Sequence, residues 1–261
     1  MRKLFSLMAA AVIVAVNISC LATRASGMSA APVSVQSVSL SDSQLADYAN
    51  QVAVLVNVER SSRGLKPLRI LPKLMTAAQI RANEITQIFD HFRPNGTKCF
   101  SVLDEVGLDF YAVGENIAAG QSTPESVMSA WMTSSEHKDN ILKSDFMYIG
   151  VGVVQKGNRL YWSQEFLKYN EFSDAYIPKE KTPVYGDIDS DGKIDSRDAS
   201  TILAEYALVS AGGVSTLSSY QKECADIDAN SKIDSRDASF VLGFYSYLSS
   251  GGKENNIKKW M

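Results

Sequence analysis

The stretch DIDSDGKIDSRD at residues 187–198 decides the fold of the C-terminal part, because it recurs as DIDANSKIDSRD at residues 226–237. From position 187 to position 200 the two copies agree at eleven of fourteen positions. Carboxylates at alternate positions around a tight turn let one short loop supply the roughly six to eight oxygen ligands that calcium prefers. A solvated acidic loop could explain one copy, but two copies with the same spacing predict two calcium sites.

The spacing assigns a ligand to each loop position. The predicted ligands of the first loop, with Lys193 acting through its backbone carbonyl, are Asp187, Asp189, Asp191, Lys193, Asp195 and Asp198. The equivalent ligands of the second loop are Asp226, Asp228, Asn230, Lys232, Asp234 and Asp237. Gly192 stands where the backbone turns sharply, whereas Ser231 takes that place in the second loop. Because Asn230 also removes one charge, we expect the second site to bind calcium more weakly.

Each loop is followed by a helical pattern with matching apolar positions. These positions are Ala199, Ile202, Leu203 and Tyr206 after the first loop, and Ala238, Val241, Leu242 and Tyr245 after the second. A half of about 35 residues cannot bury its own apolar stripe, so the two halves should pack together and should need metal to fold. No helical pattern leads into either loop.

A calcium loop followed only by an exiting helix, twice, resembles a type I dockerin, whereas an ordinary EF-hand has a helix on both sides. The resemblance covers residues 184 to about 249, and we assign residues 184–252 to this domain. It implies two bound calcium ions and docking to a cohesin module of a scaffoldin, as in the cellulosomes of bacteria that degrade plant cell walls. It also implies that loop positions ten and eleven contact the cohesin, and these are Ser196, Arg197, Ser235 and Arg236. Solvated residues of a first helical turn are the simpler interpretation.

The first residues predict export. Met1-Arg2-Lys3 precedes the apolar run Leu4–Val16, which is the order of a signal peptide and is too short for a stable membrane span. We assign residues 1–25 to a signal peptide and residues 26–42 to a flexible leader. The protein is therefore expected to be secreted and extracellular, associated with a cellulosome at the cell surface. A net charge of −3 argues against a nucleic-acid partner.

Residues 43–168 combine helical and strand patterns. Apolar periodicity predicts helices from Gln44, Pro72 and Thr123. The runs FMYIGVGVVQ and RLYWSQEFL, separated by a glycine-containing turn, predict a β-hairpin. Together these patterns indicate an α+β domain. The polar residues 169–183 are interpreted as a linker, and residues 253–261 as a frayed tail.

The two histidines of the chain, His91 and His137, both lie in this α+β region, on either side of Glu115. Imidazole and carboxylate groups together can bind a divalent metal such as zinc or carry out acid–base chemistry. Histidines buried for packing are the plainer interpretation. No serine or cysteine stands in a recognisable hydrolase motif.

Four phrases in this region, DHFRPNG, GENIAAG, AWMTSSEHKDNIL and YIGVGVV, resemble the bacterial branch of the CAP superfamily, the SCP-like domains of cysteine-rich secretory and pathogenesis-related proteins. The resemblance implies an α-β-α sandwich with a cleft of two histidines and two acids. Onto this chain it carries His91, Glu115 and His137, with Glu136 in the fourth place although Ser134 stands where eukaryotic domains have the second acid. Proteolysis, lipid or sterol binding and wall association have each been attributed to such domains.

Two functions follow as hypotheses. The first is a cellulosome-tethered CAP module that binds a wall polymer, a lipid or a protein. The second is a hydrolase, peptidase-like or directed at plant polysaccharide, that the dockerin delivers to its substrate; a glycosidase would need Glu115 and Glu136 at a suitable separation. A CAP domain that serves only as a stable spacer is the third interpretation.

Overall fold

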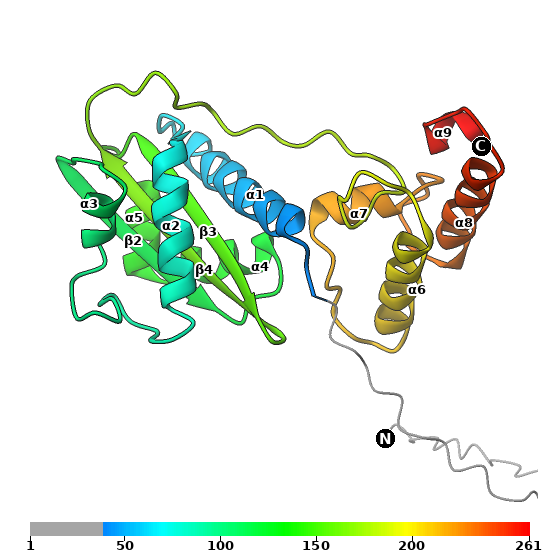
Figure 1. Cartoon of the computed structure of the whole chain (residues 1–261), viewed down its shortest axis with the longest axis horizontal. Helices are drawn as coiled ribbons and strands as arrows, with labels where there is room; N and C mark the ends of the chain where they lie inside the picture. Colours follow the sequence, from blue (N-terminus) through cyan, green and yellow to red (C-terminus); the bar gives the residue numbers. More distant parts are fainter. Residues whose placement is uncertain (1–38) are drawn as a thin grey trace, which may run out of the picture. The chain divides into compact units, whose positions relative to one another are not determined.

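The structure is a computed structural model that describes residues 39–261 (Figure 1). The predicted signal peptide, Cys20 and most of the predicted leader lie outside these residues. The end of the leader is helical, because Ser41 caps the first helix through a reciprocal pair of hydrogen bonds with Gln44. Within the described part of the chain, no helix is long and apolar enough to cross a membrane.

The N-terminal domain contains five helices and a four-stranded sheet among the described residues. The helices are α1 (Asp42–Ser61), α2 (Pro72–Glu84), α3 (Ser101–Glu105), α4 (Pro124–Thr133) and α5 (Ser135–Leu142). The strands are β1 (Arg69–Ile70), β2 (Ala112–Ala119), β3 (Tyr148–Lys156) and β4 (Arg159–Lys168), in the order β1-β3-β4-β2. The predicted hairpin is confirmed as β3 and β4, which pair antiparallel.

Alternation along β3 builds the two faces of this sheet. Ile149, Val151 and Val153 enter the core shared with α1 and α4. Gly150 and Gly152 face α2, and a Cβ at either would lie 2.2 Å from a backbone oxygen of that helix. The glycines of YIGVGVV therefore allow α2 to rest directly on the sheet, which Figure 1 shows in front of β3 and β4. Helices on both faces confirm the predicted α-β-α sandwich.

Part of the predicted linker belongs to the N-terminal domain. Tyr176 forms an antiparallel bridge with Ile70 of β1, and Phe172 packs edge-on against Tyr148 at a ring distance of 5.2 Å. These contacts were not predicted because residues 169–183 are mostly polar. Three residues of this segment pack against the apolar core: Tyr169, Phe172 and Ala175. Helix α2 ends at Glu84, so Phe89 lies beyond it and is exposed.

The C-terminal domain is all-helical, as predicted. Its helices are α6 (Ser196–Ser210), α7 (Ser219–Ala225), α8 (Ser235–Ser249) and α9 (Ile257–Trp260). Helices α6 and α8 pack against each other and bury equivalent residues, Ile202 and Val241.

Two expectations for this domain were wrong. Helix α7 leads directly into the second loop, because Ser218 caps it through a capping box with Gln221 that the apolar pattern does not reveal. Residues 253–261 are not a frayed tail, because Ile257 is buried in the core and Trp260 packs against Phe244 at a ring distance of 5.5 Å.

Candidate functional site

The first acidic loop folds around its own carboxylates. Asp187 accepts hydrogen bonds from the backbone amides of Asp191 and Gly192, both at 3.1 Å. Asp198, eleven residues after Asp187, accepts a hydrogen bond from the backbone amide of Ile188 at 2.8 Å. Side-chain oxygens of Asp187, Asp189 and Asp191 lie within 4.8 Å of one another. Backbone amides thus orient the carboxylates toward a common point.

The second loop repeats this arrangement. Asp226 accepts from the amides of Asn230 at 3.0 Å and Ser231 at 2.9 Å, and Asp237 accepts from Ile227 at 2.8 Å. Here the convergent oxygens within 4.8 Å belong to Asp226, Asp228 and Asp237.

The turn position behaves as the sequence predicts. Gly192 has a φ of +83°, and Ser231 adopts a φ of +64° in its place. Left-handed backbone costs a residue with a side chain roughly 1–2 kcal/mol. The second loop therefore reaches the same shape with strain that the first avoids.

The loops fit a divalent cation. Burial raises the pKa of Asp187 and of Asp189, and raises that of Asp198 to about 6, although backbone hydrogen bonds lower each of them. Such a concentration of partly buried negative charge is relieved when a hard cation binds several of the oxygens. Asp195 and Asp234 stand apart from the convergent groups and cap α6 and α8 instead.

The predicted partner residues are exposed on the first turns of α6 and α8. Among the described residues, Arg197 forms ion pairs with Asp189, Asp191 and Asp195, whereas Arg236 forms one, with Asp228 at 3.3 Å. Asn230 explains one missing pair, because it offers no charge where the first loop has Asp191. In addition, Arg236 makes no ion pair with Asp234, the counterpart of Asp195. The two arginines are therefore held differently.

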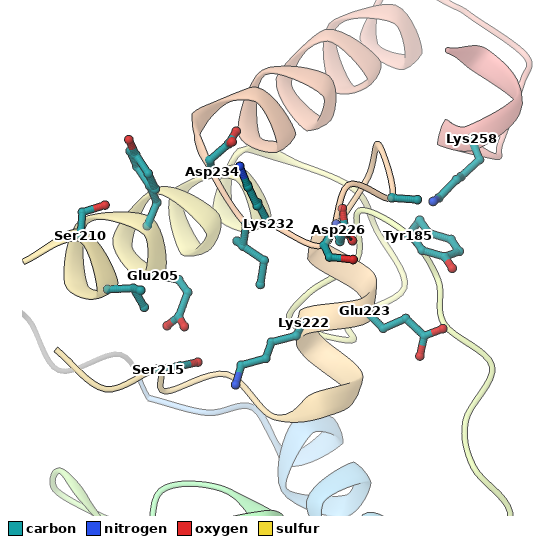
Figure 2. A pocket seen from close by; sticks show the side chains of 15 residues that line it. Tyr185, Glu205, Ser210, Ser215, Lys222, Glu223, Asp226, Lys232, Asp234 and Lys258 are labelled. Carbon is teal, nitrogen blue, oxygen red and sulfur yellow. Dashed lines mark hydrogen bonds between the residues drawn. The ribbon is translucent and has the colours of Figure 1, made fainter. Parts of the chain in front are cut away.

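A cavity of about 660 Å³ opens beside the second loop (Figure 2). Its wall includes the predicted ligands Asp226 and Asp234, so this side of the loop is open to solvent. Positively charged lysines such as Lys222 and negatively charged carboxylates such as Glu205 line the rest of the cavity. The mixture of charges does not single out a ligand class for the cavity itself.

The N-terminal domain assembles a second charged cluster, centred on Glu115 of β2. Arg81 of α2, which is fully buried, donates from Nε to Glu115 Oε2 at 2.7 Å. His91 Nδ1 lies 2.7 Å from Glu115 Oε1 and donates to it when the carboxyl is ionised. The Glu115 side chain is 1% exposed and that of His91 is 54% exposed. His91 is therefore the part of this cluster that a ligand can reach.

Charge pairing sets the ionisation of these groups. Burial raises the pKa of Glu115, but hydrogen bonds from His91 and Arg81 outweigh it and hold this pKa at about 2. The hydrogen bond to Glu115 raises the pKa of His91. With Nδ1–H directed at the carboxylate, His91 presents Nε2 to solvent as a proton donor or acceptor.

His137 and Glu136 are placed differently from His91 and Glu115. Burial and the nearby His91 lower the pKa of His137, so the two histidines share one electrostatic environment. No hydrogen bond joins the His137 ring to Glu115 among the described residues. Glu136 is exposed on the first turn of α5, where its only hydrogen bond in the described chain is from Ser134 Oγ at 3.4 Å. Glu136 thus stands outside the cluster.

Asn116, next to Glu115 in GENIAAG, ties β2 to α5. Its Nδ2 donates to the backbone oxygen of His137 at 3.0 Å, and its Oδ1 accepts from Asn140 at 2.9 Å. The phrase GENIAAG therefore supplies both a site residue, Glu115, and the residue that holds α5 in place, Asn116.

The acid that sequence reasoning missed is Glu165 of β4. Glu165 pairs directly with Glu115 across the ladder, and Gly150 pairs with Glu165 on the other side, so all three lie on the face covered by α2. Two signals were available. Ser163, Gln164 and Glu165 are three polar residues between the apolar stretches 160–162 and 166–167 of β4. Arg81 falls among the alanines of the buried stripe of α2.

Cys99 completes the cluster but makes a poor metal ligand. Its sulfur, an oxygen of Glu115 and a ring nitrogen of His91 lie within 4.8 Å of one another. Burial and the charge of Glu115 raise the pKa of the Cys99 thiol to about 12, and Arg81 already occupies Glu115. Since a zinc thiolate must be deprotonated, the cluster fits a proton-carrying site better than a zinc centre, and zinc remains a prediction.

The fold and the two loops define a two-domain protein whose C-terminal domain is built to bind calcium. Residues 54–166 match the cysteine-rich secretory protein family, CAP, and residues 185–243 match the type I dockerin domain. The chain thus contains a CAP domain followed by a type I dockerin. Type I dockerin domains bind calcium and dock to cohesin modules, and dockerin domains occur in extracellular components of cellulosomes.

Individual relatives cover about half of the chain. An uncharacterized protein of Bacillus subtilis (strain 168), YkwD, is 39% identical over 127 residues, 48% of this chain and 49% of the relative. The uncharacterized membrane protein YlbC of the same organism is 29% identical over 120 residues, 45% of this chain and 34% of the relative. The solved structure of an extracellular protein containing an SCP domain, from Bacillus anthracis str. Ames, is 25% identical with a TM-score of 0.46. The match covers 51% of this chain and 45% of that protein. This chain therefore spans half or less of the length of these proteins.

Proposed function

We propose that the dockerin holds this protein on a scaffoldin cohesin, and that the CAP domain acts there as a binding module centred on His91. The observation that supports the CAP part is the contrast between an exposed imidazole and the buried carboxylate that orients it. Such a histidine can exchange a proton or a hydrogen bond with a polar group of a ligand. Secretion and a position at the cell surface belong to this proposal.

The surroundings of His91 favour a ligand with an apolar part. Three large side chains within three residues of His91 are about half exposed, at 49%, 55% and 53%; they are Ile88, Phe89 and Phe92. Exposed apolar side chains that cluster together often mark a binding site, whereas single ones scattered over a surface are ordinary. Among polysaccharides, lipids and proteins, we therefore favour an amphipathic lipid.

The hydrolase alternative has less support. A glycosidase needs its two carboxyl groups about 5 Å or more apart on either side of the bond. Glu136, the predicted second acid, stands on the exposed first turn of α5 outside the Glu115 cluster. Glu165, the acid directly opposite Glu115, is buried beside it. The Cys99 thiol is buried and protonated, which removes it as a ready nucleophile.

A binding panel tests the CAP proposal. The full chain with calcium is mixed with lipid vesicles, soluble wall polysaccharide and peptides, alongside His91→Ala, Phe89→Ser and the control Glu136→Ala. We expect vesicle binding to fall at least about fivefold in the first two variants and to persist in the control. Hydrolysis of any panel member that is lost in His91→Ala would favour the enzyme. Unchanged binding in both variants would contradict the proposal.

The dockerin proposal is tested with a type I cohesin module. Its predicted contacts are Ser196, Arg197, Ser235 and Arg236. Because the two halves are nearly identical, changing both residues of one half should leave binding through the other, and changing all four should abolish it. Strong binding by a folded quadruple variant would exclude these residues as the contact.

A further inference from the structure

Within the part of the chain that the structure describes, no cationic side chain forms an ion pair or a hydrogen bond with Glu165. It is 1% exposed in the middle of β4, and the buried Arg81 directs its Nε and Nη groups to Glu115, Glu84 and the backbone of Asp90. Within the described residues, the one side chain that donates to Glu165 is Ser163, from Oγ to Oε1 at 2.9 Å. A carboxylate this buried, with a neutral hydroxyl as its donor, is costly.

The neighbour of Glu165 makes ionisation costlier still. Glu115 stands directly opposite on β2, and both side chains are buried on the same face of the sheet. Side chains paired in this way have Cβ atoms about 4.5–5.5 Å apart. Two buried carboxyl groups at this separation repel when both are ionised, whereas a single retained proton lets one donate a hydrogen bond to the other. Arg81 and His91 both donate to Glu115, so Glu115 is the partner that gives up its proton. The remaining proton of the pair is left on Glu165.

We propose that Glu165 carries a proton at neutral pH and donates it in a hydrogen bond to Glu115, and that through Glu115 it sets how tightly His91 holds its own proton. Glu165 is a positioning residue, since it lies behind Glu115 and reaches no ligand. The charged and titratable groups that face it are Glu115 from β2, Arg81 from α2 and Cys99 from the segment before α3. The role of His91 in ligand binding rests on the proposed function, but the protonation of Glu165 does not.

The proposal predicts the direction in which the pKa of His91 shifts when Glu165 is replaced. A neutral donor from Glu165 takes up part of the negative charge of Glu115, so less of that charge stabilises the imidazolium of His91. Removing the donor should therefore raise the pKa of His91. An ionised Glu165 would have the opposite influence, because its removal would take away a nearby negative charge and lower the pKa of His91.

The test uses the full chain with calcium and two variants of similar size. Glu165→Gln is neutral and keeps a donor, and Glu165→Leu is neutral and keeps none. The pKa of His91 is followed by NMR of the imidazole, which is assignable because the chain has two histidines and His137→Gln removes the other signal. We expect a shift below about 0.3 for Glu165→Gln and a rise of about 0.5 for Glu165→Leu. A fall in both variants would overturn the proposal.

A second measurement covers the case in which Glu165→Leu does not fold. The infrared spectrum at neutral pH should contain the carbonyl band of a protonated carboxylic acid, and Glu165→Gln should lose it while the surface control Glu136→Gln keeps it. Absence of this band in the unaltered protein would show that Glu165 is ionised. Because no ligand is present in either measurement, failure here is separate from failure of the proposed binding function.

Discussion

The calcium loops and the Glu115 cluster are both groups of carboxylates, but the repulsion between their negative charges is offset in different ways. In the loops, carboxylates such as Asp187 and Asp198 accept hydrogen bonds from backbone amides at most ten residues away and are themselves buried. In the CAP domain, Glu115 and Glu165 are fifty residues apart in sequence, are buried, and are compensated by Arg81 and by one retained proton. The loops depend on a cation from solution, whereas the CAP cluster contains its own.

The difference predicts which domain responds to ions. A cation from solution can be removed, so the loops should couple folding to calcium. A guanidinium from α2 cannot be removed, so the CAP cluster should be insensitive to chelators and sensitive to substitution. Four experiments, ordered by the expected size of effect, test whether the loops depend on calcium and the CAP cluster on its internal charges.

Calcium removal should have the largest effect. With excess chelator we expect α6 and α8 to lose their cooperative packing, because the core around Ile202 and Val241 is too small to offset chain entropy alone. The CAP domain should keep its thermal transition. Circular dichroism and amide NMR spectra with and without calcium measure both. A dockerin that stays folded in chelator, or a CAP transition that moves with it, would break the comparison.

Glu115→Ala should be the most damaging substitution in the CAP cluster. It leaves the fully buried Arg81 without one of its two carboxylate partners, and breaking a buried ion pair typically costs about 3–5 kcal/mol. Chemical denaturation of the full chain with calcium measures the loss in the CAP transition. The control Glu136→Ala, on the exposed first turn of α5, should change stability by less than about 0.5 kcal/mol. Equal effects would mean that Arg81 does not need Glu115.

Glu165→Gln should stabilise the CAP domain at neutral pH. Burial and the charge of Glu115 raise the pKa of Glu165 above its unfolded value of about 4.3. Its contribution to stability is therefore complete below that value and declines as pH rises toward the folded pKa. Glutamine has no proton to lose, so its advantage should grow with pH and vanish in acid. A variant that is less stable than the unaltered protein at neutral pH would contradict this sign.

Exchanging the turn residue should have the smallest effect. Ser231→Gly removes the left-handed strain at +64°, and about 1 kcal/mol of relief corresponds to roughly fivefold tighter calcium binding in the second loop. The matched change Gly192→Ser should weaken the first loop by a similar factor. Calorimetric titration of the full chain resolves the two sites. If Ser231→Gly leaves the weaker site unchanged, charge at Asn230 rather than strain sets the difference.

Local spacing made the dockerin predictable. The ligand positions, the left-handed turn at Gly192 and the helices that begin after each loop depend on residues within about one loop length, so the pattern of letters carries them. The hairpin of β3 and β4 was predictable for the same reason, since its alternation and its turn at Gly157 are local.

Sequence patterns were enough to predict the two calcium loops, the order of the domains, and His91 and Glu115 as members of one site. The folded chain was needed to show that Arg81 and Glu165 complete that site, that Glu136 does not, and that Ile257 and Tyr176 make packing contacts. The physical reason is that strand register and the close approach of α2 over Gly150 bring together residues whose separation in sequence carries no signal of contact.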